Sequence, residues 1–200
     1  MSLKQQLEAD FSGRENWALR RQKQIPNNRR LWICACMDER LPVDDCLGIR
    51  ADHGDAHLFR NAGGLITDDA IRSAMLTCNF FGTTEIVIIN HTECGMMSYR
   101  KETAVEALSK LYGDLSKISV DPFLGTKLKM DAGAFGDWIR LFDDVDEVCA
   151  QQVELVRNHP LIPKHVSVSG WIYEVETGNL RPPHRRVGNK VNTTKEMGAK

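Results

Sequence analysis

Two short, unbroken apolar segments constrain the fold of this chain more than any other feature. They are Leu31–Cys36 (LWICAC) and Thr84–Asn90 (TEIVIIN), and the second is rich in β-branched residues. Their length and apolar continuity predict strands that are buried on both faces. Such strands are typical of a parallel sheet whose two faces are both covered by helices.

The intervening segments supply a third strand and the helices. Residues 55–64 (DAHLFRNAGG) predict a strand that ends in a glycine turn. Pro42 can open a short helix over residues 42–49, because its missing N–H costs nothing in a first turn. A longer helix is expected over residues 68–82, capped by Asp68 or Asp69 and closed by Gly82, and another from about Gly95 to residue 113. The alternation predicts an α/β fold with a mostly parallel central sheet flanked by helices.

The remaining segments define the expected domain organisation. Residues 144–160 predict a helix that ends at Pro160, and residues 165–180 a late antiparallel strand pair that turns at ETGN. Residues 113–142 read as an irregular insertion. We therefore expect an N-terminal helical arm at 1–29, an α/β domain at 30–180 and a polar C-terminal tail at 181–200.

Composition excludes several classes of function. The chain has 200 residues and a formal net charge of −1, so no basic field indicates a nucleic-acid or membrane-surface partner. No apolar segment has the length of a signal peptide core or of a bilayer span, which makes the cytoplasm the expected location. Six cysteines in a cytosolic chain of this size indicate thiols, metal ligands or catalytic groups rather than a disulfide scaffold.

Cysteine and histidine side chains follow two of the predicted strands. Cys36 ends the first strand, and His91 and Cys94 follow Asn90. Ligands of open α/β sheets bind at the carboxyl ends of the strands, so these side chains can meet there. Two sulfurs and an imidazole suit zinc, and three protein ligands leave the open position of a catalytic site. Taken singly, each feature is as well explained by a buried core residue.

Three motifs occur in order between residues 30 and 99: Cys36-x-Asp38-x-Arg40, RNAGG at 60–64, and His91-Thr92-x-Cys94-Gly95-Met96. Their order and spacing resemble the β-class carbonic anhydrases, in particular a small branch that also includes hydrolases of carbonyl sulfide and carbon disulfide. The resemblance returns weakly at residues 168–180. It does not cover the insertion or the C-terminal tail.

The resemblance implies that Cys36, His91 and Cys94 hold Zn²⁺ and that Asp38 and Arg40 form a catalytic dyad. Two thiolates would cancel the charge of the metal, so bound water should be less acidic than at tris-histidine zinc. Asp38 can orient zinc-bound hydroxide, or it can bind the metal as a fourth ligand and close the site. The planar guanidinium of Arg40 can hold Asp38 away from the metal. The alternative is a surface ion pair of little energetic value.

Other residues carry weaker expectations. Gly63 and Gly64 allow close backbone approach after a strand, and Gly95 at a helix start could offer amide donors to an anionic product. His57 is a candidate proton shuttle by residue type alone, although an ordinary strand residue explains it better. Burial is the expected role of the other four cysteines, which are Cys34, Cys46, Cys78 and Cys149.

The main functional expectation is attack of zinc-bound hydroxide on CO₂ to give bicarbonate. The alternative is hydrolysis of carbonyl sulfide or carbon disulfide with release of hydrogen sulfide, since residues 36–40 and 91–96 do not separate these substrates. Aromatic residues of the insertion region could reshape the access route: Phe123, Phe135, Trp138 and Phe142.

Two rival interpretations and one assembly expectation complete the sequence-based view. A redox dithiol formed by Cys34 and Cys36 would need a geometry that is awkward for neighbours in one strand. A purely structural zinc would keep Asp38 as a permanent ligand. The resemblance also implies a homodimer or a dimer of dimers (homotetramer), in which the N-terminal helix and the C-terminal arm could be exchanged between subunits.

Overall fold

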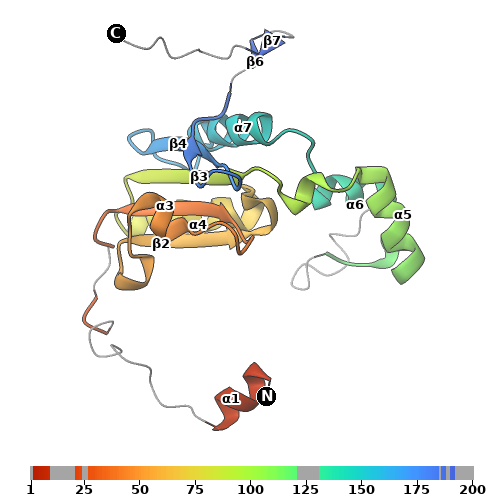
Figure 1. Ribbon diagram of the computed structural model, residues 1–200, viewed down its shortest axis with the longest axis horizontal. Coiled ribbons are helices and arrows are strands. Elements are labelled where there is room, and N and C mark those ends of the chain that lie inside the picture. Colours follow the sequence, from red (N-terminus) through yellow and green to blue (C-terminus); the bar gives the residue numbers. More distant parts are fainter. Residues whose placement is uncertain are drawn as a thin grey trace.

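A five-stranded sheet forms the centre of the molecule (Figure 1). The computed structural model describes residues 2–9, 21–23, 27–120, 131–184, 186–187 and 190–191. The strand order is β2-β1-β3-β4-β5, in which the first four strands are parallel and β5 runs antiparallel to β4. The strands are β1 (Leu31–Cys36), β2 (Ala56–Asn61), β3 (Glu85–His91), β4 (Ser167–Tyr173) and β5 (Leu180–Arg181). The predicted α/β architecture with a late antiparallel strand is confirmed.

Helices and short 3₁₀ turns connect the strands. The helices are α1 (Leu3–Ala9), α3 (Val43–Leu47), α4 (Asp68–Phe80), α5 (Lys101–Tyr112), α6 (Ala132–Ile139) and α7 (Val145–Asn158). The 3₁₀ turns are η1 (Ala51–His53), η2 (Ala62–Gly64), η3 (Gly95–Met97) and η4 (Leu115–Lys117). A separate two-stranded ladder pairs β6 (Arg186–Val187) with β7 (Lys190–Val191). No helix in the described ranges is both long and apolar enough to cross a bilayer.

The two faces of the sheet carry different cores, as the period-2 alternation of strand side chains requires. Trp32 and Cys34 pack with side chains from α4 and α7, whereas Ile33 and Ala35 pack on the opposite face with residues from the α3 segment. Each of these four side chains is at most 2% exposed. Burial on both faces explains why β1 is apolar throughout.

Two local expectations about helix starts are wrong. The N-cap of α4 is Thr67, whose hydroxyl accepts from the backbone N–H of Ala70, while Asp68 and Asp69 lie inside the first turn. There their charges still complement the positive end of the helix dipole. The helix expected from Gly95 is also interrupted: only the 3₁₀ turn η3 forms there, and α5 begins at Lys101. Residues 98–100 are exposed and none belongs to the buried core, so burial does not favour a continuous helix there.

The expected insertion contains more regular structure than its sequence indicates. Helix α6 lies within it and packs against α5, and in Figure 1 the two helices extend away from one end of the sheet. Residues 121–130 of this region lie outside the described residues, as do residues 10–20 of the expected N-terminal helix. The helix expected over 144–160 is confirmed as α7, which ends before Pro160.

Candidate metal centre and active site

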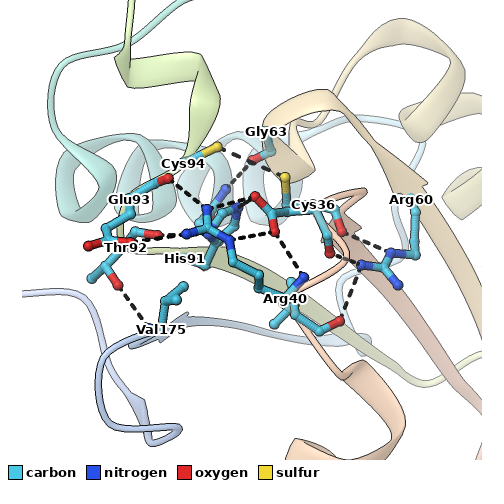
Figure 2. Close-up of polar contacts among 12 residues, drawn as sticks. Cys36, Arg40, Arg60, Gly63, His91, Thr92, Glu93, Cys94 and Val175 are labelled. Carbon is cyan, nitrogen blue, oxygen red and sulfur yellow. Dashed lines mark hydrogen bonds and ion pairs between the residues drawn. The ribbon is translucent and has the colours of Figure 1, made fainter.

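The parallel register of the sheet brings the three predicted metal ligands together. Ala35 of β1 pairs with Ile89 of β3, so Cys36 and His91 lie at the same carboxyl edge. Cys94 returns to this edge through a turn in which Glu93 adopts a left-handed conformation, with φ of 53°. The sulfurs of Cys36 and Cys94 are 3.9 Å apart, and all three ligand atoms lie within 4.8 Å of one another (Figure 2).

His91 presents an unpaired ring nitrogen to this cluster. Its side chain is completely buried, and Nδ1 donates to the carbonyl oxygen of Thr92 at 2.8 Å. This bond places the proton of a neutral ring on Nδ1 and leaves the lone pair on Nε2. Nε2 is buried and has no hydrogen-bond partner among the described residues. A buried acceptor without a donor is costly, so a bound cation explains it.

The donor set and its spacing fit zinc. Tetrahedral zinc with Zn–S bonds of about 2.3 Å places two sulfurs about 3.8 Å apart. The observed separation of 3.9 Å agrees with that geometry. Cys36, His91 and Cys94 could therefore hold a zinc ion with one position left open.

The two thiols influence each other strongly. A hydrogen bond from the Cys94 thiol lowers the pKa of Cys36, and the same contact raises the pKa of Cys94. Both side chains are 3% exposed, so neither thiolate can be stabilised by bulk water. The pair thus favours one thiolate and one thiol, and only a cation would stabilise both thiolates together.

Asp38 and Arg40 form the bidentate contact that the sequence suggested. Arg40 donates from Nε to Asp38 Oδ1 at 3.0 Å and from Nη2 to Asp38 Oδ2 at 2.9 Å. The Arg40 backbone N–H also donates to Oδ1. These hydrogen bonds hold the pKa of Asp38 well below its usual range. Asp38 Oδ2 lies 3.8 Å from His91 Nε2, which places the carboxylate beside the ligand cluster.

Glu93 and Arg60 hold the dyad in place. Arg40 also donates from Nη1 to Glu93 Oε2 and from Nη2 to the Glu93 carbonyl oxygen, both at 3.0 Å. Arg60 donates to the carbonyl oxygens of Cys36 and Asp38, at 2.8 and 2.7 Å (Figure 2). Glu93 was not among the predicted site residues, although its position between the candidate ligands His91 and Cys94 could have indicated a role at the site.

The glycine turn approaches Cys36 as closely as expected. A Cβ atom on Gly64 would lie 2.6 Å from the Cys36 backbone nitrogen and 2.8 Å from the Ile89 carbonyl oxygen. Gly63 and Gly64 have φ of 80° and 61°, which favour glycine. Gly95 begins the 3₁₀ turn η3 rather than an α-helix, and its role as an amide donor to an anionic product stays a prediction.

Several other candidates lie away from the site. His57 in β2 pairs with Trp32 in β1. Trp32 precedes Cys36 by four residues, so His57 lies about 13 Å along the sheet from the level of Cys36, at about 3.3 Å per residue. A proton-shuttle role for His57 is therefore not supported. Cys34 is fully buried and donates to the carbonyl oxygen of Leu65, in a different core cluster from Cys36. That separation argues against a redox dithiol.

The aromatic residues of the insertion region divide into two groups. Phe135 and Trp138 contact each other on α6, with ring centroids 5.5 Å apart. Phe142 instead packs beside the site, since its ring would lie 3.2 Å from a Cβ atom on Gly63. Phe123 lies outside the described residues. Of the described aromatic candidates, Phe142 is the one beside the glycine turn.

The family model described as carbonic anhydrase matches residues 31–180. The chain belongs to the carbonic anhydrase family, and its relatives place it in the β class. A carbon disulfide hydrolase from Acidithiobacillus thiooxidans is 72% identical over 200 residues and covers 100% of both chains. Beta-carbonic anhydrase 1 from Mycobacterium tuberculosis is 31% identical over 157 residues, covering 78% of this chain and 83% of the relative. The apo structure of a carbon disulfide hydrolase superposes with a TM-score of 0.78 and 41% identity, covering 99% of this chain and 98% of the other.

These similarities favour the alternative substrate class over the one first expected. Membership of the β-carbonic anhydrase family and an enzymatic role agree with the sequence analysis. Hydration of CO₂ as the main activity is less well supported, because a relative that is 72% identical over the whole chain is named for carbon disulfide.

Proposed function

We propose that this chain hydrolyses carbon disulfide at a zinc ion held by Cys36, His91 and Cys94. The first hydrolysis converts carbon disulfide and water to carbonyl sulfide and hydrogen sulfide. The second converts carbonyl sulfide and water to CO₂ and hydrogen sulfide. The observation that carries this proposal is 72% identity over the full length of a carbon disulfide hydrolase.

The chemistry of the site divides between the metal and the dyad. A zinc ion held by Cys36, His91 and Cys94 would lower the pKa of water and so supply a nucleophile, less strongly than tris-histidine zinc because two thiolates cancel the charge of the metal. Asp38 remains ionised, because Arg40 lowers its pKa, and its carboxylate can accept a hydrogen bond from that water. Arg40 engages both carboxylate oxygens, which would restrain Asp38 from binding the metal as a fourth ligand.

The wall beside the site is suited to an apolar linear substrate. Met96, Met97 and Phe142 pack in the same core cluster as Cys36 and Cys94. Thioether and aromatic groups contact sulfur favourably and offer no strong hydrogen bonds that would retain water. Carbon disulfide, which lacks hydrogen-bonding groups of its own, loses little on leaving water for such a surface.

A paired assay on the zinc-loaded full chain tests the proposal. We expect hydrogen sulfide release from both carbon disulfide and carbonyl sulfide, measured against stopped-flow hydration of CO₂ by the same sample. Rapid CO₂ hydration without sulfide release from either sulfur substrate would refute the proposed substrate class.

Substitution of Arg40 tests the proposed role of the dyad. We expect Arg40→Met to lower sulfide release by about 10–100-fold at unchanged zinc content, because Asp38 loses the group that holds it. Arg72→Met is the control, since Arg72 is an exposed residue of α4 that pairs with Asp69. Equal rates for both variants and the unmodified chain would remove the dyad from the mechanism.

We further propose that the chain assembles as a homodimer or a dimer of dimers in the cytoplasm. Large apolar side chains are exposed on or beside α5 and α6, including Tyr99, Leu111, Tyr112 and Trp138 at 49–73% exposure. Such a surface is more often covered in an assembly than left in water. Light scattering of the purified chain measures the assembly directly, and a monomer at micromolar concentration would refute it.

A further inference from the structure

A buried glutamine lies behind the glycine turn and takes no part in the proposed chemistry. Gln152 belongs to α7 and is 6% exposed. Its Oε1 accepts from the backbone N–H of Ile66, and its Nε2 donates to Asn90 Oδ1 at 3.3 Å. A polar side chain in a core is tolerated only when its hydrogen bonds are made, and here one bond forms at each end of the amide.

Asn90 extends this contact to the glycine turn. It is 1% exposed and immediately precedes His91 in β3. Its Nδ2 donates to the carbonyl oxygens of Gly63 and Gly64, at 2.7 and 3.4 Å. Two side-chain amides therefore connect α7, the end of β3 and the glycine turn through buried hydrogen bonds.

The glycine turn in turn lies against the strand that carries the first ligand. A Cβ atom on Gly64 would meet the Cys36 nitrogen at 2.6 Å and the Ala35 carbonyl carbon at 2.9 Å. The turn cannot move toward β1 without displacing the backbone of Cys36. The amide network thus reaches Cys36 through Gly64 and His91 through Asn90.

We infer that Gln152 is a positioning residue for the metal site, which sets the placement of Cys36 relative to His91 through Asn90 and the glycine turn. This inference rests on the proposed zinc site. If Gln152 only filled space, an apolar side chain of similar volume would serve equally well. Groups that orient metal ligands from outside the first coordination shell typically change metal affinity by about 10–100-fold when removed.

Two substitutions separate the contributions of the amide. Gln152→Met keeps the approximate volume and removes both hydrogen bonds. Gln152→Glu keeps an oxygen acceptor for the Ile66 N–H, replaces the donor to Asn90 with a second oxygen, and adds a negative charge when it is ionised. Val156→Ala is the control. Val156 is a fully buried residue of the same helix, so its substitution removes packing contacts but no side-chain hydrogen bond.

The rate of zinc release to excess chelator is measured for each protein, together with the absorption spectrum of its cobalt-substituted form. We expect both Gln152 variants to release zinc about tenfold faster or more and to shift the cobalt ligand-field bands. The Val156→Ala protein should match the unmodified chain in both measurements. If Gln152→Met fails to fold, Gln152→Glu alone decides the outcome.

Unchanged release and an unchanged cobalt spectrum in the Gln152 variants would overturn the inference. Equally fast release from Val156→Ala would overturn it too, because the effect would then be general destabilisation. Failure of the unmodified chain to bind zinc is a separate result, which refutes the proposed zinc site and removes the basis for the inference.

Discussion

Substitution of Gly64 by alanine tests how closely the glycine turn packs on the strand that carries Cys36. At φ of 61° an L-residue is strained by about 1–2 kcal/mol. The added Cβ would also lie 2.6 Å from the Cys36 nitrogen and 2.8 Å from the Ile89 carbonyl oxygen. Both are backbone atoms of central strands and cannot rotate away, so overpacking adds about 1–3 kcal/mol. Gly64→Ala should therefore lower the free energy of unfolding by about 2–5 kcal/mol.

Gly48 provides a matched control for the backbone contribution. Its φ is 59°, and a Cβ atom there would meet nothing within 4 Å. Gly48→Ala should cost only about 1–2 kcal/mol, the strain of the left-handed conformation. The difference between the two variants isolates the contact with β1.

Urea denaturation of both metal-free variants at equal protein concentration measures the two free energies of unfolding. The total expected for Gly64→Ala remains below the stability of a typical domain, about 5–15 kcal/mol, so both proteins should give complete unfolding curves. Zinc content after loading should fall for Gly64→Ala alone, since the contact displaces Cys36. Equal losses of stability and equal zinc contents would show that the turn does not press on the ligand strand.

Two further predictions concern the metal ligands and the contact between Asp146 of α7 and Arg181 of β5. Cys94→Ala should reduce the zinc content, measured by elemental analysis, from one ion per chain toward none. Cys78→Ala is the control and should keep its zinc, because Cys78 is a buried cysteine of α4. A full zinc content in Cys94→Ala would disprove the three-ligand site. Burial disfavours ionised Asp146, but hydrogen bonds from Arg181 and from the backbone N–H of His184, together with nearby positive charge, outweigh this and lower its pKa. Its stabilising contribution is therefore complete above the ordinary pKa of 3.8 and is lost as pH falls through the lower folded value. The deficit of Asp146→Asn in urea midpoint should shrink below pH 3.8, and a deficit that stays constant from pH 7 to pH 3 would contradict this.

The parts of the fold that were predicted correctly depend on local patterns. Strands β1 and β3 are buried on both faces, so β1 and the centre of β3 are apolar and the strands are visible in the sequence. The candidate ligands lie within three residues of strand ends, and parallel pairing brings such ends to one edge. The site could therefore be assembled from the sequence without knowledge of distant contacts.

The features that were missed depend on competition between neighbouring residues that can each cap a helix, or on contacts between residues far apart in the sequence. Thr67, Asp68 and Asp69 can all cap a helix, and only the extended backbone of Thr67 decides among them. Gln152 lies at the spacing of the buried residues Cys149 and Val156, so a polar residue in that apolar stripe was the available signal. Its partners are 62 and 86 residues away, which no local pattern reveals.

The substrate could not be resolved from the motif residues for a chemical reason. Carbon disulfide, carbonyl sulfide and CO₂ are linear molecules with an electrophilic central carbon, and each requires the same nucleophile. In the proposed mechanism Asp38 and the three candidate ligands supply it, so they carry no information on which of the three reacts. Selectivity would then depend on the residues that surround the site, such as Phe142 beside Gly63.

The late strand β4 and the residues after it also contribute hydrogen bonds to the candidate site. Thr92, between two candidate ligands, donates its backbone N–H to the Tyr173 carbonyl oxygen at 3.0 Å. Its hydroxyl accepts from the Val175 N–H at 2.9 Å and donates to Glu176 Oε2 at 2.7 Å. These bonds restrain the turn that carries Cys94, and the glycine turn packs against the backbone of Cys36. Both ligand segments are therefore held in place by hydrogen bonds and packing of the protein itself, and this is the preorganisation that the proposed zinc site requires.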